Sequence, residues 1–179
     1  PDVSFSGNIY DVEDNRTYSL DTMPLEYSTE GIGDFRISSV GIRYENGASA
    51  LDLRYENHEI LPGKYSIPGL PAVYAEDYEA QTLAITLKDT ASDIRLILKY
   101  GVLPVFVVIT RSAVITNNGH GNVMILRAHS LCLDIPYGKW EWVHFHGRWG
   151  KERTPERLPL LHGIQESSSK RGTSSHHHN

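Results

Sequence analysis

Cysteine is almost absent from this sequence, and so is any long run of apolar or basic residues. The only cysteine, Cys132, lies in the apolar segment LRAHSLCLDI, where a small buried side chain is favoured over a reactive thiol. No disulfide framework can form within one chain. No apolar run approaches the about 20 residues of a membrane helix, and the first residues, PDVSFSGNIYD, lack the regions of a signal peptide. We therefore expect a soluble protein without a membrane partner, although an upstream signal could have been removed.

The charge balance argues against nucleic acid as a partner. The 179 residues include 22 acidic and 17 basic side chains, which gives a formal net charge of -5, and no long basic run occurs. A surface that follows phosphates along a nucleic acid needs clustered Lys and Arg. An apolar content of 40% is enough for one sizeable core, so a single globular domain is the first expectation.

The pattern of apolar residues predicts an all-β fold with little helix. Val, Ile, Leu, Thr and Tyr alternate or form short runs, with Gly, Asn, Asp and Pro at regular intervals between them. Residues 35–61 read as a β-hairpin about the Asn46-Gly47 pair, because Asn-Gly supplies the positive φ angles of tight turns. Residues 117–122, NNGHGN, predict a second turn.

Several strand segments are apolar on successive residues, which is typical of strands covered on both faces. LAITLKD, IRLILKYGVLPVFVVITRSAVIT and VMILRAHSLCLDI are the clearest. We therefore predict a two-layer antiparallel β-sandwich rather than an open sheet. The domain is expected to span residues 1–164, and residues 165–179, rich in Ser, Gly and charge, are expected to form a linker or arm toward another domain.

One stretch, YGKWEWVHFHGRWGKERTPER, holds all three tryptophans of the chain. An indole face can stack on the C–H face of a sugar ring, and Trp149, in a turn-like segment, is the candidate for this role. Trp140, Trp142, His144 and His146 alternate along one strand, so the structural reading, in which they fill a pocket between sheets, is favoured for the first two.

Other kinds of chemistry lack support in the sequence. The histidines have no accepted zinc-ligand spacing and no cysteine partners, so we expect no metal and no cofactor. Glu26, Glu30 and Asp34 could be imagined as the carboxylate pair of a glycosidase, but acids in a Gly-rich loop more often form turn hydrogen bonds. No nucleophile elbow, phosphate-binding glycine loop or HExxH motif occurs.

Six segments, taken in order along nearly the whole chain, are similar to the N-terminal domain of family 36 α-galactosidases, the melibiase and raffinose-degrading enzymes of bacteria and fungi. These segments are NRTYSLDTMPLEYSTEGIGDFR, LDLRYENHEIL, PGLPAVYAE, VITRSAVITNNG, the tryptophan block with GRWGKER, and SSSKRGTSSHHHN. The resemblance implies a large β-sandwich of the galactose-mutarotase type, which precedes a (β/α)8 catalytic barrel and a small C-terminal β domain.

The resemblance also implies that the chain is catalytically silent by itself. Family members are retaining hydrolases whose nucleophilic and acid/base aspartates belong to the barrel, and no segment of that kind occurs here. No catalytic residue is therefore assigned. The expected partners are the enzyme's own barrel, α-galactoside sugars in the whole enzyme, and further copies of the chain, since the N-terminal domain of many members assists tetramer formation.

Three residues match family positions that bind or enclose the sugar. Asp2 resembles an acid that binds galactose hydroxyls, Arg16 an arginine beside it, and Trp149 the tryptophan that walls the sugar pocket. Carboxylate and guanidinium groups give directional bonds to hydroxyls, and indole gives a flat apolar face.

Two other functions remain open at this stage. The chain could be an autonomous carbohydrate-binding module that uses residues 140–149, or a purely structural sandwich whose aromatic residues are all core. A bacterial cytoplasmic location is expected for the parent α-galactosidase, and secretion if the source is fungal.

Overall fold

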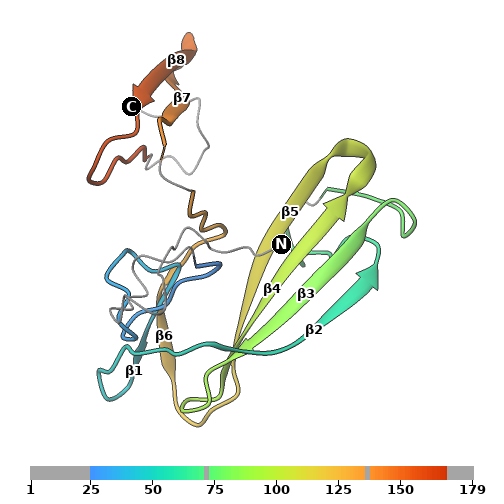
Figure 1. The fold of residues 1–179 in the computed structure, drawn as a ribbon, viewed down its shortest axis with the longest axis vertical. Helices are drawn as coiled ribbons and strands as arrows, with labels where there is room; N and C mark the ends of the chain where they lie inside the picture. The colour runs from blue at the N-terminus through green and yellow to red at the C-terminus, as the bar shows by residue number, and fades with distance from the viewer. Residues whose placement is uncertain (1–24, 71–72, 136–137, 169–179) are drawn as a thin grey trace, which may run out of the picture. The chain divides into compact units, whose positions relative to one another are not determined.

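The chain forms two compact β units, which are described separately. The computed structural model describes residues 25–70, 73–135 and 138–168, and the two units comprise Pro1–Ile135 and Pro136–Asn179. Figure 1 shows the strands in chain order: β1 (Val40–Tyr44), β2 (Arg54–Pro62), β3 (Gln81–Lys88), β4 (Ile94–Leu103), β5 (Val108–Asn117), β6 (Val123–Ala128), β7 (Glu141–Arg148) and β8 (Lys151–Pro159). The predicted boundary between residues 164 and 165 stays a prediction.

All strand pairs among the described residues are antiparallel. The first unit holds a four-stranded sheet in the order β2-β3-β4-β5 and a two-stranded sheet of β1 and β6, and the second unit holds β7 paired with β8. The helical content of the described part is one short 3-10 turn, Pro104–Phe106, between β4 and β5. The prediction of an all-β, antiparallel sandwich with little helix is confirmed.

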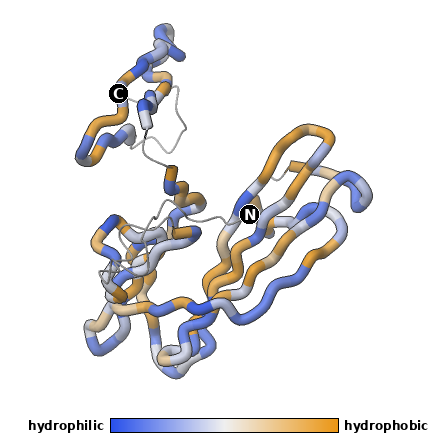
Figure 2. Tube along the Cα trace, viewed as in Figure 1, coloured by the Kyte–Doolittle hydropathy of each residue, from blue (hydrophilic) through white to orange (hydrophobic). Residues whose placement is uncertain are grey.

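The core of the first unit lies between its two sheets. On β4 alternate residues are buried, because successive side chains point to opposite faces of a strand, and these are Ile94, Leu96 and Leu98. They join Val40 and Ile42 of β1 in one apolar cluster. Figure 2 shows the hydrophobic segments along the strands of the four-stranded sheet.

Neighbouring strands add to the same face of the large sheet. In the register, Leu96 lies between Leu87 of β3 and Ile115 of β5, and Leu98 lies between Ile85 and Ala113. All four flanking side chains are partly buried against the core. The two layers are therefore held by one continuous apolar surface, which is the packing expected of stacked sheets.

The predicted hairpin over residues 35–61 is wrong, although its turn forms. Gly47 has φ +85°, and the Tyr44 N–H donates to the Ala48 carbonyl at 2.9 Å. Strand β1 nevertheless pairs with β6, and β2 pairs with β3. Between them the side chain of Leu51 is buried and its N–H donates to Glu30 O at 3.0 Å, so the chain crosses from one sheet to the other.

The predicted turn at residues 117–122 is confirmed, since it connects β5 to β6. Among the residues that the structure describes, none forms a helix with the length and apolar character that crossing a membrane demands.

Replacement of the central core leucine should destabilise the fold strongly. We expect Leu96→Ala to lower the free energy of unfolding by about 2–5 kcal/mol, because Leu96 is 1% exposed and its loss leaves a cavity. The matched control is Ile60→Ala on β2, where the side chain is 65% exposed, with an expected change within about 0.5 kcal/mol. Urea unfolding measures both, and equal losses would contradict this description of the core.

Candidate functional site

The tryptophan-rich segment folds as a hairpin with Trp149 in its turn. Strands β7 and β8 pair in antiparallel register, and Arg148 faces Lys151 across the last rung before the turn. The Gly150 N–H donates to Glu152 Oε1 at 2.8 Å, which fixes the turn locally. The Trp149 side chain is 89% exposed. An indole in this position belongs to no core of the described residues and is free to meet another surface.

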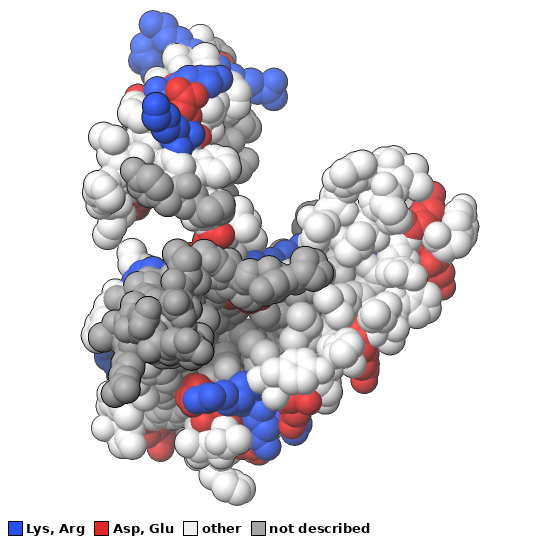
Figure 3. Space-filling view, viewed as in Figure 1, with Lys and Arg blue, Asp and Glu red and all other residues white. Residues whose placement is uncertain are grey.

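Basic side chains surround this tryptophan. Arg148, Lys151 and Arg153 are all exposed near the hairpin turn, and Figure 3 shows Lys and Arg side chains gathered on the β7–β8 unit. Guanidinium and ammonium groups donate hydrogen bonds to hydroxyl and carboxylate oxygens. The hairpin end therefore combines a flat apolar face with several donors.

The other tryptophans occupy different environments. Trp140 precedes β7 and is 46% exposed, and its carbonyl accepts a hydrogen bond from the Leu160 N–H at 2.9 Å. Trp142 is half-buried on one face of the hairpin, with its ring centroid 4.6 Å from that of His144. The packing of Trp142 fits the structural reading.

The half-buried face of the hairpin also carries two histidines that share one carboxylate. His144 Nε2 lies 2.9 Å and His146 Nδ1 3.8 Å from Glu156 Oε2. Together with Trp142 and Leu158 they line a pocket of about 410 Å³. Among the described residues no group of three or more His, Cys, Asp or Glu side chains is arranged to hold a metal ion.

Of the three residues predicted to bind the sugar, the structure locates one. Trp149 is in the hairpin turn, whereas Asp2 and Arg16 lie outside the described residues. Their proximity to Trp149 therefore stays a prediction.

The three carboxylates that were weighed as a glycosidase pair are each held by an arginine. Glu26 pairs with Arg111, Glu30 with Arg127 and Asp34 with Arg36, all at 3.0 Å. Glu30 Oε1 also accepts from Ser38 Oγ at 2.9 Å. Carboxylates that are ion-paired in this way are more typical of structural contacts than of the general acid and the nucleophile of a glycosidase.

Arg111 is a structural residue that sequence reasoning did not single out. Its side chain is 10% exposed and donates to the Cys132 carbonyl at 2.9 Å and to the Glu26 carbonyl at 2.7 Å. Its guanidinium lies 5.8 Å from the Tyr27 ring and 5.4 Å from the Tyr100 ring. The signal in the sequence was an arginine within the otherwise uncharged strand VITRSAVIT.

Tyr100 belongs to the same cluster as Arg111 and Glu26. Its hydroxyl donates to Glu26 Oε1. Burial raises the pKa of Tyr100 well above its usual range, and the bond to the Glu26 carboxylate raises it further. The phenol therefore stays neutral and acts as a donor throughout the physiological pH range.

Asp34 and Arg36 form a second ion pair, in which the Asp34 carboxylate is buried. Burial alone raises the pKa of the Asp34 carboxyl, but hydrogen bonds and charge from Arg36 outweigh it, so the pKa is lowered overall. Arg36 Nη1 also lies 2.8 Å from Asp134 Oδ2, and the Leu25 N–H donates to the same oxygen. This network joins three segments of the first unit.

Comparison with known proteins decides the family. A model described as the glycosyl hydrolase family 36 N-terminal domain matches residues 2–179. The chain belongs to this family. Its sequence is 46% identical over 178 residues to the bifunctional alpha-galactosidase/sucrose kinase AgaSK of Mediterraneibacter gnavus, covering 99% of this chain and 19% of that protein. It is 44% identical over 166 residues to the alpha-galactosidase AgaA of Geobacillus stearothermophilus, covering 92% of this chain and 23% of the relative.

Solved structures agree with the family 36 assignment. The crystal structure of AgaA from Geobacillus stearothermophilus superposes with a TM-score of 0.89 at 40% identity, over 99% of this chain and 26% of AgaA. A variant of AgaA in complex with raffinose matches with a TM-score of 0.87 at 42% identity, over 100% of this chain and 25% of that one. The family 36 domain thus spans about a fifth to a quarter of the relatives it matches.

The Asp34–Arg36 pair predicts a specific dependence of stability on pH in this family 36 domain. Because the folded pKa of Asp34 is lowered, its stabilisation is present above the unfolded pKa of about 3.9 and is lost as the pH falls through the folded pKa. We expect Asp34→Asn to cost about 1.5–3 kcal/mol at neutral pH, and less at low pH. Unfolding in urea between neutral and acidic pH measures this.

Asp52→Asn is the matched control for that experiment. Asp52 also pairs with an arginine two residues later, at 2.8 Å, but the two side chains are 44% and 75% exposed. Exposed pairs contribute about 0–1 kcal/mol. If both variants lose the same stability with the same pH dependence, the role assigned to the buried Asp34 carboxylate is wrong.

Proposed function

We propose that this chain is the non-catalytic N-terminal domain of a retaining α-galactosidase that hydrolyses terminal α-galactosides of the melibiose and raffinose type. In this proposal the domain supports oligomerisation and helps to wall the galactose pocket. The observation that carries the proposal is the family match over residues 2–179. The relatives are alpha-galactosidases, and variants of one of them, AgaA, were solved with raffinose and with stachyose.

Catalysis is assigned to a part of the enzyme outside this sequence. A retaining glycosidase needs two carboxyl groups about 5–5.5 Å apart on either side of the scissile bond. Glu26, Glu30 and Asp34 are instead each bound to an arginine. The chain spans only 19% to 26% of its relatives, which leaves ample length for a catalytic barrel.

Trp149 is proposed as the aromatic wall of the sugar pocket. Its exposure of 89% argues against a core role, and the basic side chains beside it supply donors for hydroxyl groups. An indole stacks on the C–H face of galactose, while Asp2 and Arg16 are proposed to bind hydroxyls of the same sugar. The purely structural reading is therefore disfavoured for Trp149.

The hairpin of β7 and β8 supports the idea of a docked neighbour. A two-stranded hairpin by itself is marginally stable in water, and this one leaves Val143 and Phe145 46% and 42% exposed on one face. We propose that the hairpin is stabilised by packing against the catalytic barrel, which would bury these side chains and hold Trp149 in place.

A second exposed apolar surface supports the oligomer, proposed to be a tetramer. It comprises the turn between β4 and β5, where Val105, Phe106 and Val107 are 78%, 63% and 91% exposed, and the start of β5, where Ile109 is 68% exposed. Val107 also has φ 53°, which is costly for a β-branched residue. Apolar patches of this kind commonly mark protein interfaces, and another subunit is the proposed occupant.

The alternative function is an autonomous carbohydrate-binding module. The exposed indole of Trp149 is the observation in its favour. Calorimetry of the 179-residue chain with galactose separates the two. Heat of binding that Trp149→Ala abolishes favours the module. The absence of any heat that depends on Trp149 favours a site completed by the barrel. The bacterial cytoplasmic location stays a prediction.

The chain alone should not hydrolyse a chromogenic α-galactoside. The expected rate equals that of buffer, because no carboxyl pair with the required roles is present in the described residues. The longer protein that includes the barrel should be active in the same assay. Turnover by the purified 179-residue chain, surviving repurification, would refute the non-catalytic assignment.

In the longer protein, Trp149→Ala should raise KM for raffinose by about tenfold, since lost stacking of roughly 1.4 kcal/mol corresponds to that factor. Trp149→Phe keeps an aromatic face and should recover most of the affinity. Leu161→Ala, at a 70% exposed apolar residue of the same unit, is the control and should leave KM unchanged. If Trp149→Ala has the same KM for raffinose as the parent enzyme, the assignment of Trp149 to the sugar pocket is wrong.

A further inference from the structure

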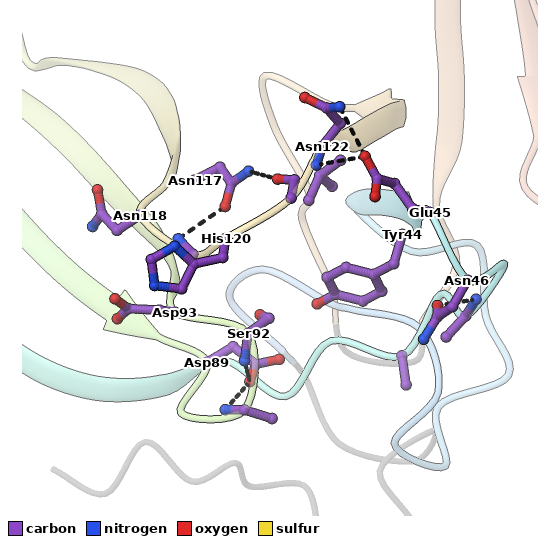
Figure 4. Close-up of a pocket in the computed structure, with 16 residues that line it drawn as sticks. Tyr44, Glu45, Asn46, Asp89, Ser92, Asp93, Asn117, Asn118, His120 and Asn122 are labelled. Atoms are coloured by element: carbon purple, nitrogen blue, oxygen red, sulfur yellow. Dashed lines mark hydrogen bonds between the residues drawn. The ribbon is translucent and has the colours of Figure 1, made fainter.

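Three turns meet at one end of the first unit and line an open pocket that the proposed function does not use. They are the turn after β1, the turn between β3 and β4, and the turn between β5 and β6 (Figure 4). The pocket has a volume of about 650 Å³. This lies within the usual range for small-molecule sites in proteins. Trp149 does not line it.

Hydrogen bonds within the β3–β4 turn make the floor of this pocket rigid. The buried Asp89 carboxylate accepts from the N–H groups of Ala91 at 2.7 Å and Ser92 at 3.2 Å. Its other oxygen accepts from the Asp52 N–H at 3.0 Å. The turn is thus fixed in the folded protein before any ligand binds.

The three turns are also tied to one another. Glu45 Oε1 accepts from the N–H of Asn122 at 3.1 Å and from its side-chain amide at 2.8 Å, and the Asn118 N–H donates to the Asp93 carbonyl at 3.2 Å. A Cβ at Gly119 would lie 2.3 Å from the Ser92 carbonyl oxygen, so only glycine permits this approach. A preorganised pocket loses little conformational entropy when it binds a ligand.

Within this rigid frame one hydroxyl group of the pocket is buried and lacks a hydrogen-bond partner among the described residues. It is the hydroxyl of Ser92. The Tyr44 hydroxyl, the Asn118 side-chain amide and the His120 imidazole also line the pocket, and Figure 4 shows Tyr44 and His120 on opposite sides of it. Unpaired buried polar groups in native proteins often indicate a missing ligand or water.

The lining chemistry selects the class of ligand. Carboxylates of Glu45, Asp89 and Asp93 lie in the pocket, and no Lys or Arg is among the described lining residues. Lys88 is engaged with Asp93 at 2.7 Å. Phosphates and other anions would be repelled. Hydroxyl groups, in contrast, donate to carboxylates and accept from amides and hydroxyls at the same time.

The apolar part of the lining fits the same class. Ala48, Ala50, Ala91 and Val123 contribute small methyl surfaces, and Tyr44 contributes a ring. A sugar ring has C–H groups for such surfaces and hydroxyls at its rim. The pocket therefore offers small apolar surfaces within a mostly polar lining.

We propose that this pocket is a binding site for a neutral mono- or oligosaccharide, separate from the hairpin that carries Trp149. The ligand places its C–H face on the Tyr44 ring and the alanine methyl groups, and its hydroxyls on Ser92, on Asn118 and on the Tyr44 hydroxyl at the edge of that ring. The site stands on residues 44–50, 89–93 and 117–123 of this chain and requires no catalytic barrel.

Amide NMR of the isotope-labelled 179-residue chain, titrated with raffinose, tests this site. The expected result is a saturable shift of amide signals in residues 44–50, 89–93 and 117–123, with weak affinity. Tyr44→Phe keeps the ring and Asn118→Ala changes an exposed side chain, so both should stay folded. Each should weaken binding by about tenfold or more, because a hydroxyl or amide contact is lost.

Trp149→Ala is the matched control and should leave these shifts unchanged, which separates this site from the one under the proposed function. Three results would overturn the proposal. They are linear shifts without saturation, shifts that persist undiminished in both Tyr44→Phe and Asn118→Ala, and shifts with calcium chloride but none with raffinose. The dispersed spectrum of each variant reports that it is folded.

Discussion

Face-to-face burial of alternate residues on β4 against β1 is the interaction on which the rest of the first unit depends. Leu96 and Leu98 contact the cluster that contains Val40 and Ile42, and all four are at most 1% exposed. Because each strand presents alternate side chains to this interface, the two sheets are fixed in register as well as in separation. The packed sheets therefore hold the turns at their ends in defined positions. The side chains of these turns are not part of the core and can contact a ligand.

Buried polar contacts complete what the apolar core begins. Arg111, with its side chain only 10% exposed, reaches the carbonyls of Glu26 and Cys132, and the Asp34–Arg36 pair reaches Asp134. A charge removed from water must be paired and hydrogen-bonded, and here each is. Glu26 and Asp34 are thereby engaged in structural contacts, as we propose for an N-terminal domain that leaves catalysis to another part of the enzyme.

We propose that the domain meets its neighbours through the apolar surfaces that the described residues leave exposed. Trp149 is exposed in the β7–β8 turn, and Val107 is exposed with a positive φ in the β4–β5 turn. Neither side chain stabilises the isolated chain by burial, because its apolar surface stays in contact with water. The pocket lined by Tyr44 and Ser92 differs from them, because it is complete within one unit and is rigid without a partner.

The sequence by itself determined the all-β class, the turns at Gly47 and at residues 117–122, and the family, because alternation, turn residues and ordered segments are local signals that survive in any context. Only the tertiary structure decided the pairing of strands. The segments on either side of Gly47 read as a hairpin, yet they belong to different sheets, since Leu51 between them is buried in the core. The pocket between the three turns was equally hidden, because it joins residues up to about 80 positions apart through contacts that no local pattern encodes.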